Sequence, residues 1–242
     1  MKSFLNKIIK SKLFVNVVLC SIVVAVFVVI AVTPVSTDVV GVSTTQKAIY
    51  KGNENSGGVA YTFNVYQGTK EVNSILDVLK EKGVKATFFV GGCWADDNEK
   101  TLIRIRDDGH EIGSHGYYHK DHAKISYDEN LKEMQYTHQL IKGLVGVDIV
   151  NFAPPSGSFS NNTLKACETM GYRAIMWTND TIDWRDKDCE KIYSRATKNC
   201  SAGNIILMHP TTQTVKTLSK IIDFYLQNGL TGLTVSNVIK GV

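Results

Sequence analysis

The sequence predicts an α/β protein in which seven β/α units form a distorted barrel, preceded by a single N-terminal transmembrane helix. Three observations predict this architecture. Short apolar runs alternate with amphipathic helical patterns from residue 58 onward, polar side chains follow the ends of those runs, and a long uncharged segment precedes them all. The chain has 242 residues, which suffices for one domain of this kind.

The N-terminal segment is predicted to anchor the chain in a membrane. Residues 1–12 carry four lysines and no acid, and residues 13–33 contain no charge. About 20 apolar residues span a bilayer, and positive charge before them keeps that end in the cytoplasm. We therefore expect a single-pass protein of the cell membrane with its domain outside; secretion after signal cleavage is the alternative. Residues 34–57, rich in Ser, Thr, Gly and Asn, predict a linker to a domain at 58–242.

Charge and cysteine usage exclude two classes of site. The formal net charge is +4, and the four leading lysines account for it, leaving 23 Lys and Arg against 23 Asp and Glu in the rest. A domain with equal numbers of basic and acidic residues has no net positive charge that would attract nucleic acid. The cysteines show no C-x-x-C spacing, which argues against a zinc–thiolate cluster. Buried free thiols are favoured, with a Cys189–Cys200 disulfide as the alternative.

Strands and helices are expected to alternate along the domain. The first run, VAYTFNV, is rich in aromatic and β-branched residues, as strands are. The stretch at 70–83 has apolar side chains at helical spacing and ends at a glycine. The expected strands are 59–65, 85–90, 111–115, 149–154, 173–178, 204–209 and 230–235, and the expected helices are 70–83, 126–146, 160–171 and 214–229, with one more starting near Asp188.

Chemically capable side chains cluster where the predicted strands end. In barrels of this type the active site lies on the loops at the C-terminal ends of the strands. The side chains found there are Asn64, His115 with His119, Asp180 with Asp183, and His209. We therefore expect these residues to meet in one site. For Asp183, capping of the following helix is an equally good interpretation.

The stretch GSHGYYHKDH predicts a metal site. Two imidazoles at a strand end, His115 and His119, can bind one zinc ion. Asp121 or His122 is close enough in sequence to supply a third ligand or to orient His119. The alternative is that these histidines are ordinary polar loop residues.

Aromatic residues near the same strand ends predict a sugar-binding rim. Trp94, Tyr117 and Trp184 are placed to stack on sugar rings. Core packing is the competing interpretation, and it is favoured for Trp177, which lies within a predicted strand.

These segments, in this order, resemble the polysaccharide deacetylases, the NodB-homology family of metal-dependent carbohydrate esterases. The resemblance covers about residues 58–240 and is strongest to membrane-anchored, sporulation-type bacterial members. It rests on KATFFVGG (85–92), GHEIGSH (109–115), GSHGYYH (113–119), PPSG (154–157), DTIDW (180–184) and LMH (207–209).

The resemblance implies removal of N-acetyl groups from an amino-sugar polymer. A divalent metal, most simply zinc, polarises the attacking water, an aspartate accepts its proton, and a histidine protonates the leaving amine. The matching positions give His115 and His119 as metal ligands and His209 as the acid. The groove residues implied are Pro155, Ser156, Gly157, Trp184 and Leu207.

The chain departs from the family pattern in its first motif. The family reads roughly T-F-D-D-G, whereas this chain reads TFNVYQG. Asn64 stands at the position of the general base and Val65 at that of the metal aspartate. Ala153 replaces the arginine that pairs with the base.

Two functions remain open at this point. The first is a metal-dependent hydrolase that deacetylates peptidoglycan or a chitin-like polymer, with a rebuilt site in which Asp180 or Asp183 and His209 move protons; a variant of it acts on a different amide or ester. The second is a catalytically inactive module that binds cell-wall glycan.

Overall fold

The computed structural model describes residues 16, 19 and 46–242. The predicted basic tail, nearly all of the predicted transmembrane segment and the first half of the predicted linker lie outside these residues. Within the described part of the chain, no helix is long and apolar enough to cross a membrane.

The strands form one parallel sheet that stays open. Its order is β5-β4-β3-β2-β1-β7-β6, and β8 pairs with the start of β1. The sheet is therefore a half-barrel with β5 and β6 at its two ends, and the closed barrel predicted from sequence is wrong in this respect. The strands are β1 (Gly58–Val65), β2 (Thr87–Val90), β3 (Glu111–Ser114), β4 (Asn151–Phe152), β5 (Arg173–Ala174), β6 (Asn179–Asp180), β7 (Ile205–Met208) and β8 (Thr231–Leu233).

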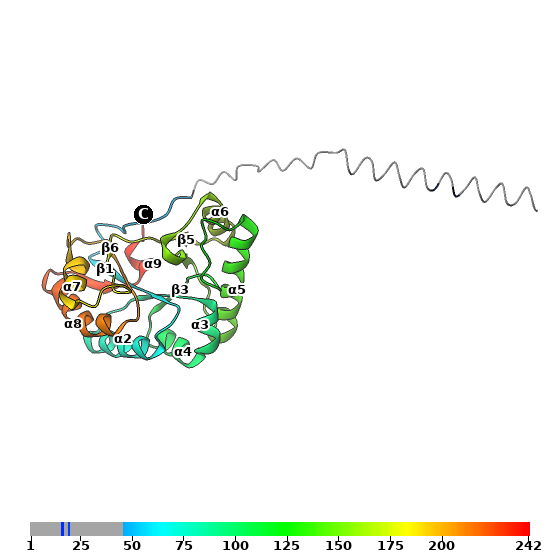
Figure 1. The fold of residues 1–242 in the computed structure, drawn as a ribbon. Helices are drawn as coiled ribbons and strands as arrows, with labels where there is room; N and C mark the ends of the chain where they lie inside the picture. Colours follow the sequence, from blue (N-terminus) through cyan, green and yellow to red (C-terminus); the bar gives the residue numbers. More distant parts are fainter. Residues whose placement is uncertain (1–15, 17–18, 20–45) are drawn as a thin grey trace, which may run out of the picture. The chain divides into compact units, whose positions relative to one another are not determined.

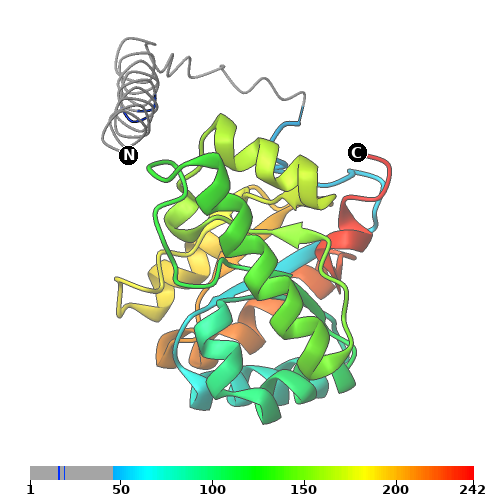
Figure 2. The ribbon, with the colours of Figure 1, turned by 90° about the vertical axis from the view of Figure 1, so that its right-hand side faces the viewer.

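Helices cover the outside of the sheet (Figure 1). Helix α2 packs against α8, α8 against α7, and α5 against α6. Figure 2 shows α5, in green, running across the face turned toward the viewer. The helices are α2 (Thr69–Lys82), α3 (Gly92–Asp97), α4 (Glu99–Asp107), α5 (Tyr127–Val145), α6 (Asn161–Met170), α7 (Cys189–Thr197), α8 (Thr212–Gln227) and α9 (Val235–Val238), with a 3₁₀ turn, η1, at Pro155–Gly157.

The helices expected from sequence are present, and α3, α4 and α9 are added. Helix α7 begins near Asp188 as expected, but its cap is Asp188 and not Asp183, because the Asp188 side chain accepts hydrogen bonds from the amides of Glu190 and Lys191. Helix α4 was missed because charged residues surround Leu102 and Ile105, its buried apolar pair. The four cysteines between residues 46 and 242 are free thiols, and of these only Cys167 is buried as the sequence favoured.

Strand β1 separates two apolar layers. Tyr61, Phe63 and Val65 point into the main core, between the sheet and the helices. Ala60 belongs to a smaller cluster on the inner side, beneath which α9 lies. Because successive side chains of a strand point to opposite faces, Asn64 lies on the inner side and its neighbour Val65 on the outer side.

The end of the half-barrel where the strands begin is tied together by Glu111. One oxygen of its carboxylate accepts hydrogen bonds from Thr87 Oγ1 and from the Ser236 amide, and the other accepts from Asn151 Nδ2 at 2.8 Å and from the Ser236 hydroxyl. Three strands and α9 therefore meet at one half-buried acid. This end is structural, which leaves the opposite end free for a site.

Candidate functional site

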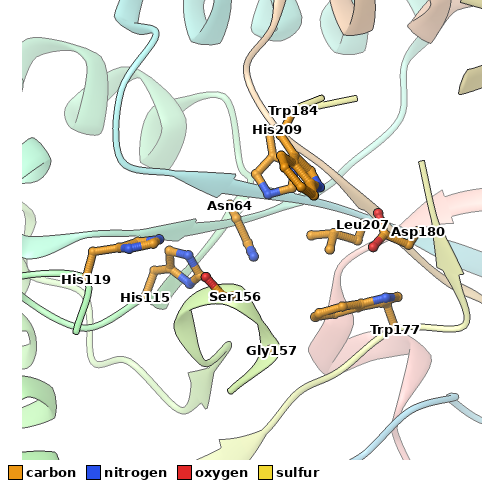
Figure 3. Close-up of a pocket in the computed structure, with 10 residues that line it drawn as sticks. All are labelled: Asn64, His115, His119, Ser156, Gly157, Trp177, Asp180, Trp184, Leu207 and His209. Carbon is orange, nitrogen blue, oxygen red and sulfur yellow. The ribbon is translucent and has the colours of Figure 1, made fainter. Parts of the chain in front are cut away.

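A cavity of about 380 Å³ opens at the C-terminal ends of the strands. Figure 3 shows its lining: the two histidines lie on one side of Asn64, and Trp177 and Asp180 lie on the other. The lining residues are Asn64, His115, His119, Ser156, Gly157, Trp177, Asp180, Trp184, Leu207 and His209. The sequence predicted all of these except Trp177 as site residues.

His115 presents a free ring nitrogen to the cavity. It follows β3 directly and is 2% exposed. Its Nδ1 lies 2.7 Å from the carbonyl oxygen of Ala153, so Nδ1 carries the proton and donates it there. Burial, and then the nearby imidazole of His119, lower the pKa of His115 to about 3. His115 is therefore neutral at ordinary pH, with Nε2 available as an acceptor.

His119 is held beside His115 by an unusual backbone. The centroids of the two rings are 5.0 Å apart. His119 has φ of 55°, in the left-handed region that side chains rarely adopt. Ser156 and Ile182, in two other loops around the cavity, share this feature. Such backbone costs about 1 kcal/mol or more per residue and concentrates at functional sites.

Asp183 fixes the orientation of His209. Its carboxylate is fully buried, and Oδ1 lies 2.8 Å from His209 Nδ1. Oδ2 accepts from the His209 amide at 2.7 Å and from Thr214 Oγ1 at 2.5 Å. His209 in its neutral form is thus protonated on Nδ1. The structure supports this orienting role rather than helix capping, which Asp188 performs instead.

Asn64 lies between the histidine pair and His209 (Figure 3). Its side chain is buried, and its Oδ1 has no hydrogen-bond partner within the described chain. Ala153, at the position of the family's arginine, belongs to the inner apolar cluster. The centre of the cavity is therefore an uncharged amide and not a carboxylate.

The residues present do not make a zinc site of the usual kind. Structural and catalytic zinc ions normally have at least three protein donors. Here His115 and His119 offer two imidazoles, whereas Asp180 lies beyond Leu207 on the far side of Asn64 (Figure 3). Among residues 16, 19 and 46–242, no group of three or more His, Cys, Asp or Glu side chains is placed to hold a metal.

The two proposed replacement ligands do not line the cavity. The Asp121 carboxylate accepts from Ser158 Oγ at 2.5 Å and pairs with Lys124 at 2.9 Å on the surface. His122 is fully buried, with Nδ1 2.6 Å from Asn130 Oδ1. Its Nε2 is unpartnered within the described chain, but it faces the space beside Gly116 rather than the cavity.

Val65 is also turned away from the cavity. Its side chain has no exposed surface and packs in the main core. The resemblance assigns the metal-binding aspartate of the family to this position. An aspartate here would place its carboxylate among apolar side chains. A buried unpaired charge costs several kcal/mol.

Three predicted groove residues lie elsewhere. Trp94 is buried in the core, where Nε1 donates to Thr69 Oγ1 at 3.1 Å, because the chain turns into α3 at this point. Pro155 is buried within η1. Tyr117 lies outside the lining but beside it. Conversely, Trp177 faces the cavity because the chain leaves β5 after Ala174, so the strand that would have buried this indole ends early.

Glu133, which the sequence did not single out, holds the loop that carries the histidines. This acid of α5 is nearly fully buried. Its Oε2 accepts from the amides of Tyr117 and Tyr118 at 2.8 and 2.7 Å, and Lys120 Nζ lies 3.6 Å from Oε1. The signal available in the sequence was an acidic residue on the apolar face of the predicted helix at 126–146, 14 residues after His119.

Removing this carboxylate should loosen the loop. Glu133→Ala is expected to lower the free energy of unfolding by about 2 kcal/mol, because two amides lose a charged acceptor. It should also speed hydrogen exchange at the Tyr117 and Tyr118 amides. Glu133→Gln is the matched control, since its carbonyl oxygen can still accept from both amides. Equal exchange in wild type and Glu133→Ala would contradict the assignment.

Comparison with known proteins agrees with this geometry. The model of the family described as polysaccharide deacetylase matches residues 51–175. An uncharacterized protein of Bacillus subtilis, YlxY, is 37% identical over 174 residues, which are 72% of this chain and 54% of that protein. The chain thus spans about half the length of this relative. A peptidoglycan-N-acetylglucosamine deacetylase of Bacillus cereus is 31% identical over 196 residues, covering 79% of this chain and 71% of the relative.

A solved structure resembles the fold closely. It is that of a protein from Bacillus anthracis described as a CE4 family pseudoenzyme, with a TM-score of 0.78 and 33% identity over 81% of this chain and 70% of that one. A mutant of that protein is described as having restored enzymatic activity. The family model covers more than half of the sequence, and the fold matches that of the solved relative: the chain belongs to the polysaccharide deacetylase family.

Proposed function

We propose that the chain binds the N-acetylated glycan of peptidoglycan in this cavity and does not deacetylate it at the rate of an enzyme. Relatives named as peptidoglycan deacetylases support the choice of glycan. The pseudoenzyme among the solved relatives supports the loss of catalysis. The chain keeps the cavity but has no carboxylate at its centre.

The observation that carries the proposal is the side chain of Asn64. An amide cannot accept the proton of an attacking water at neutral pH, so the site has no general base at this position. It offers N–H and C=O groups, and His115 Nε2 adds a neutral acceptor. A secondary amide such as an N-acetyl group has one donor and one acceptor, which these groups complement. Trp177 and Trp184 supply aromatic faces for the sugar rings.

The proposal predicts a preference for acetylated sugars. Wild-type protein is expected to bind an N-acetylglucosamine tetramer about tenfold more tightly than the glucosamine tetramer, because Asn64 at the centre of the cavity gives an acetamido group a donor and an acceptor but gives an ammonium group no opposite charge. Asn64→Asp should reverse this preference at pH 7, since a carboxylate attracts the ammonium and loses the amide donor. Isothermal titration calorimetry with both tetramers measures this.

Asn55→Asp is the matched control, because it makes the same chemical change on an exposed loop before β1. Its preference should equal that of wild type. Equal affinity of wild type for both tetramers would contradict the proposal, as would acetate release by wild type at an enzyme's rate.

A second candidate is metal-dependent N-deacetylation of the same polymer. The Asp183–His209 pair favours it, because a buried carboxylate that fixes a histidine tautomer suits an acid that protonates a leaving amine. His115 and His119 are two imidazoles that lie side by side in the cavity, and zinc is expected to bind weakly to two ligands. Stoichiometric zinc binding together with acetate release by wild type would favour this candidate over the first.

We also propose that residues 13–33 anchor the chain in the cell membrane with the domain outside. The length and lack of charge of this segment support the anchor, and peptidoglycan as ligand supports the orientation. Fusion of a reporter enzyme after residue 242, active only outside the cytoplasm, tests this topology.

A further inference from the structure

Four tyrosines form a surface beside the histidine end of the cavity, which we call the tyrosine shelf: Tyr66, Tyr117, Tyr118 and Tyr136. Three of them are among the most exposed large side chains, at 39% for Tyr66, 55% for Tyr118 and 49% for Tyr136. Exposed aromatic groups that touch one another are unusual on a soluble surface and mark interaction sites.

The backbone is shaped to seat two of these rings. Gly91 and Gly92 lie directly beneath Tyr66 and Tyr117: a Cβ on Gly91 would fall 2.4 Å from Tyr66 Cδ2, and one on Gly92 would fall 2.2 Å from Tyr117 Cδ2. Any larger residue at either position would displace a ring. The amide of Gly92 also donates to the Gly116 carbonyl at 2.9 Å, which ties α3 to the histidine loop.

The shelf is continuous with the cavity. The ring of Tyr66 lies 4.9 Å from that of His119, which lines the cavity. Tyr117 makes edge contacts with Tyr118 at 4.7 Å and with Tyr136 at 6.1 Å between centroids. Tyr66 therefore adjoins the cavity wall, and the rings from Tyr117 to Tyr136 cross the loop to α5. The two groups are neighbours because Tyr66 and Tyr117 lie over the consecutive residues Gly91 and Gly92. The amides of Tyr117 and Tyr118 are held by Glu133, so the rings are presented by a fixed backbone.

The chemistry of the shelf suits sugars. A tyrosine ring offers an apolar face to the C–H groups of a sugar and a hydroxyl to its polar groups, with little loss of conformational entropy. Lys120 Nζ lies 5.9 Å from the centroid of the Tyr118 ring. Trp177 lies on the side of the cavity away from the histidine pair, and Trp184 is drawn beside His209 (Figure 3). Aromatic surfaces at both ends fit a strand that passes through the cavity.

We propose that the tyrosine shelf binds the sugar units that adjoin the one held in the cavity, so that the chain recognises a polymer strand and not a single sugar. This inference rests on the proposed function. It assigns to the shelf one occupant, the continuation of the same N-acetylated glycan.

The test compares oligomer lengths. Wild-type affinity for N-acetylglucosamine oligomers, measured by calorimetry, is expected to rise about tenfold from dimer to hexamer as the shelf is filled. The double variant Tyr118→Ala/Tyr136→Ala should lose this rise and keep the affinity for the dimer. Tyr118→Phe should keep most of it, because the ring remains. Tyr50→Ala removes an equally exposed ring from outside the shelf and should change nothing.

The outcomes separate the two proposals. If the double variant, shown by circular dichroism to be folded, keeps the full rise with length, the shelf does not bind glycan. The inference is also overturned if wild type binds the hexamer no more tightly than the dimer. The same holds if affinity rises with length only for peptidoglycan fragments that carry stem peptides. If no oligomer binds wild type at any length, the proposed function fails first.

Discussion

Replacing Asn64 with aspartate should raise acetate release from N-acetylglucosamine oligomers by at least about 100-fold over the wild-type background, in the presence of zinc. A positioned general base is worth about 100- to 10,000-fold in rate. Asn64 is central in the cavity, with the histidine pair on one side and His209 on the other. The introduced carboxylate would be placed to accept a proton and would add an oxygen donor beside two imidazoles. His209, fixed by Asp183, is already in place.

The measurement is acetate released per enzyme per minute, with a zinc titration in parallel. Asn64→Ala should show no increase, because it removes the amide without supplying a base. Asn55→Asp should show none either, because its carboxylate lies far from the cavity on the chain segment before β1. A folded Asn64→Asp variant that binds the tetramer and zinc but releases no acetate would show that the Asn64 amide is not the cause of the missing activity.

Asp183→Ala is expected to lower the free energy of unfolding by about 3 kcal/mol. The carboxylate is fully buried and accepts three hydrogen bonds, two from His209 and one from Thr214. Alanine would leave the His209 amide without its acceptor and would remove one of the two hydroxyl or carboxylate partners of Thr214 Oγ1, the other being Thr211 Oγ1. Urea unfolding measures the loss, and it should be larger than that of Glu133→Ala.

Asp183→Asn separates this structural role from the orientation of His209. Asparagine keeps one oxygen, which can still accept from the His209 amide and Thr214, so most of the stability should remain. Its NH₂ group would then face His209 Nδ1 and force the proton to Nε2. Nitrogen chemical shifts of the imidazole report this tautomer. An unchanged tautomer in Asp183→Asn, or stability equal to wild type in Asp183→Ala, would refute the assigned contacts.

The sequence predicted the parallel α/β fold because apolar runs and helical periodicity are local signals. It placed the site correctly at the strand ends because that rule depends on topology alone. It could not reveal that the sheet stays open, because closure depends on how far strands continue. Strand β5 ends after two residues, and this short length also exposes Trp177, which an apolar run had suggested was buried.

The direction in which side chains point was the second property that the sequence could not predict. Trp94 follows the end of a predicted strand and Asp121 is close in sequence to His119, but α3 turns the first into the core and surface partners hold the second. No pattern in the sequence marked Tyr66 as a residue beside the cavity, because the position of its ring depends on Gly91, which lies beneath it. The buried contact of Asp183 with His209 spans 26 residues and is set by the neighbouring strands β6 and β7, which no local pattern records.

The alternation of side chains along β1 places Asn64 and Val65 under different physical constraints. A substitution at position 64 changes the chemistry of the cavity and leaves the apolar core as it is. A substitution at position 65 changes the packing of that core first. Two neighbouring residues of one strand can therefore be altered separately, the first to change what the cavity binds or converts and the second to change the stability of the fold.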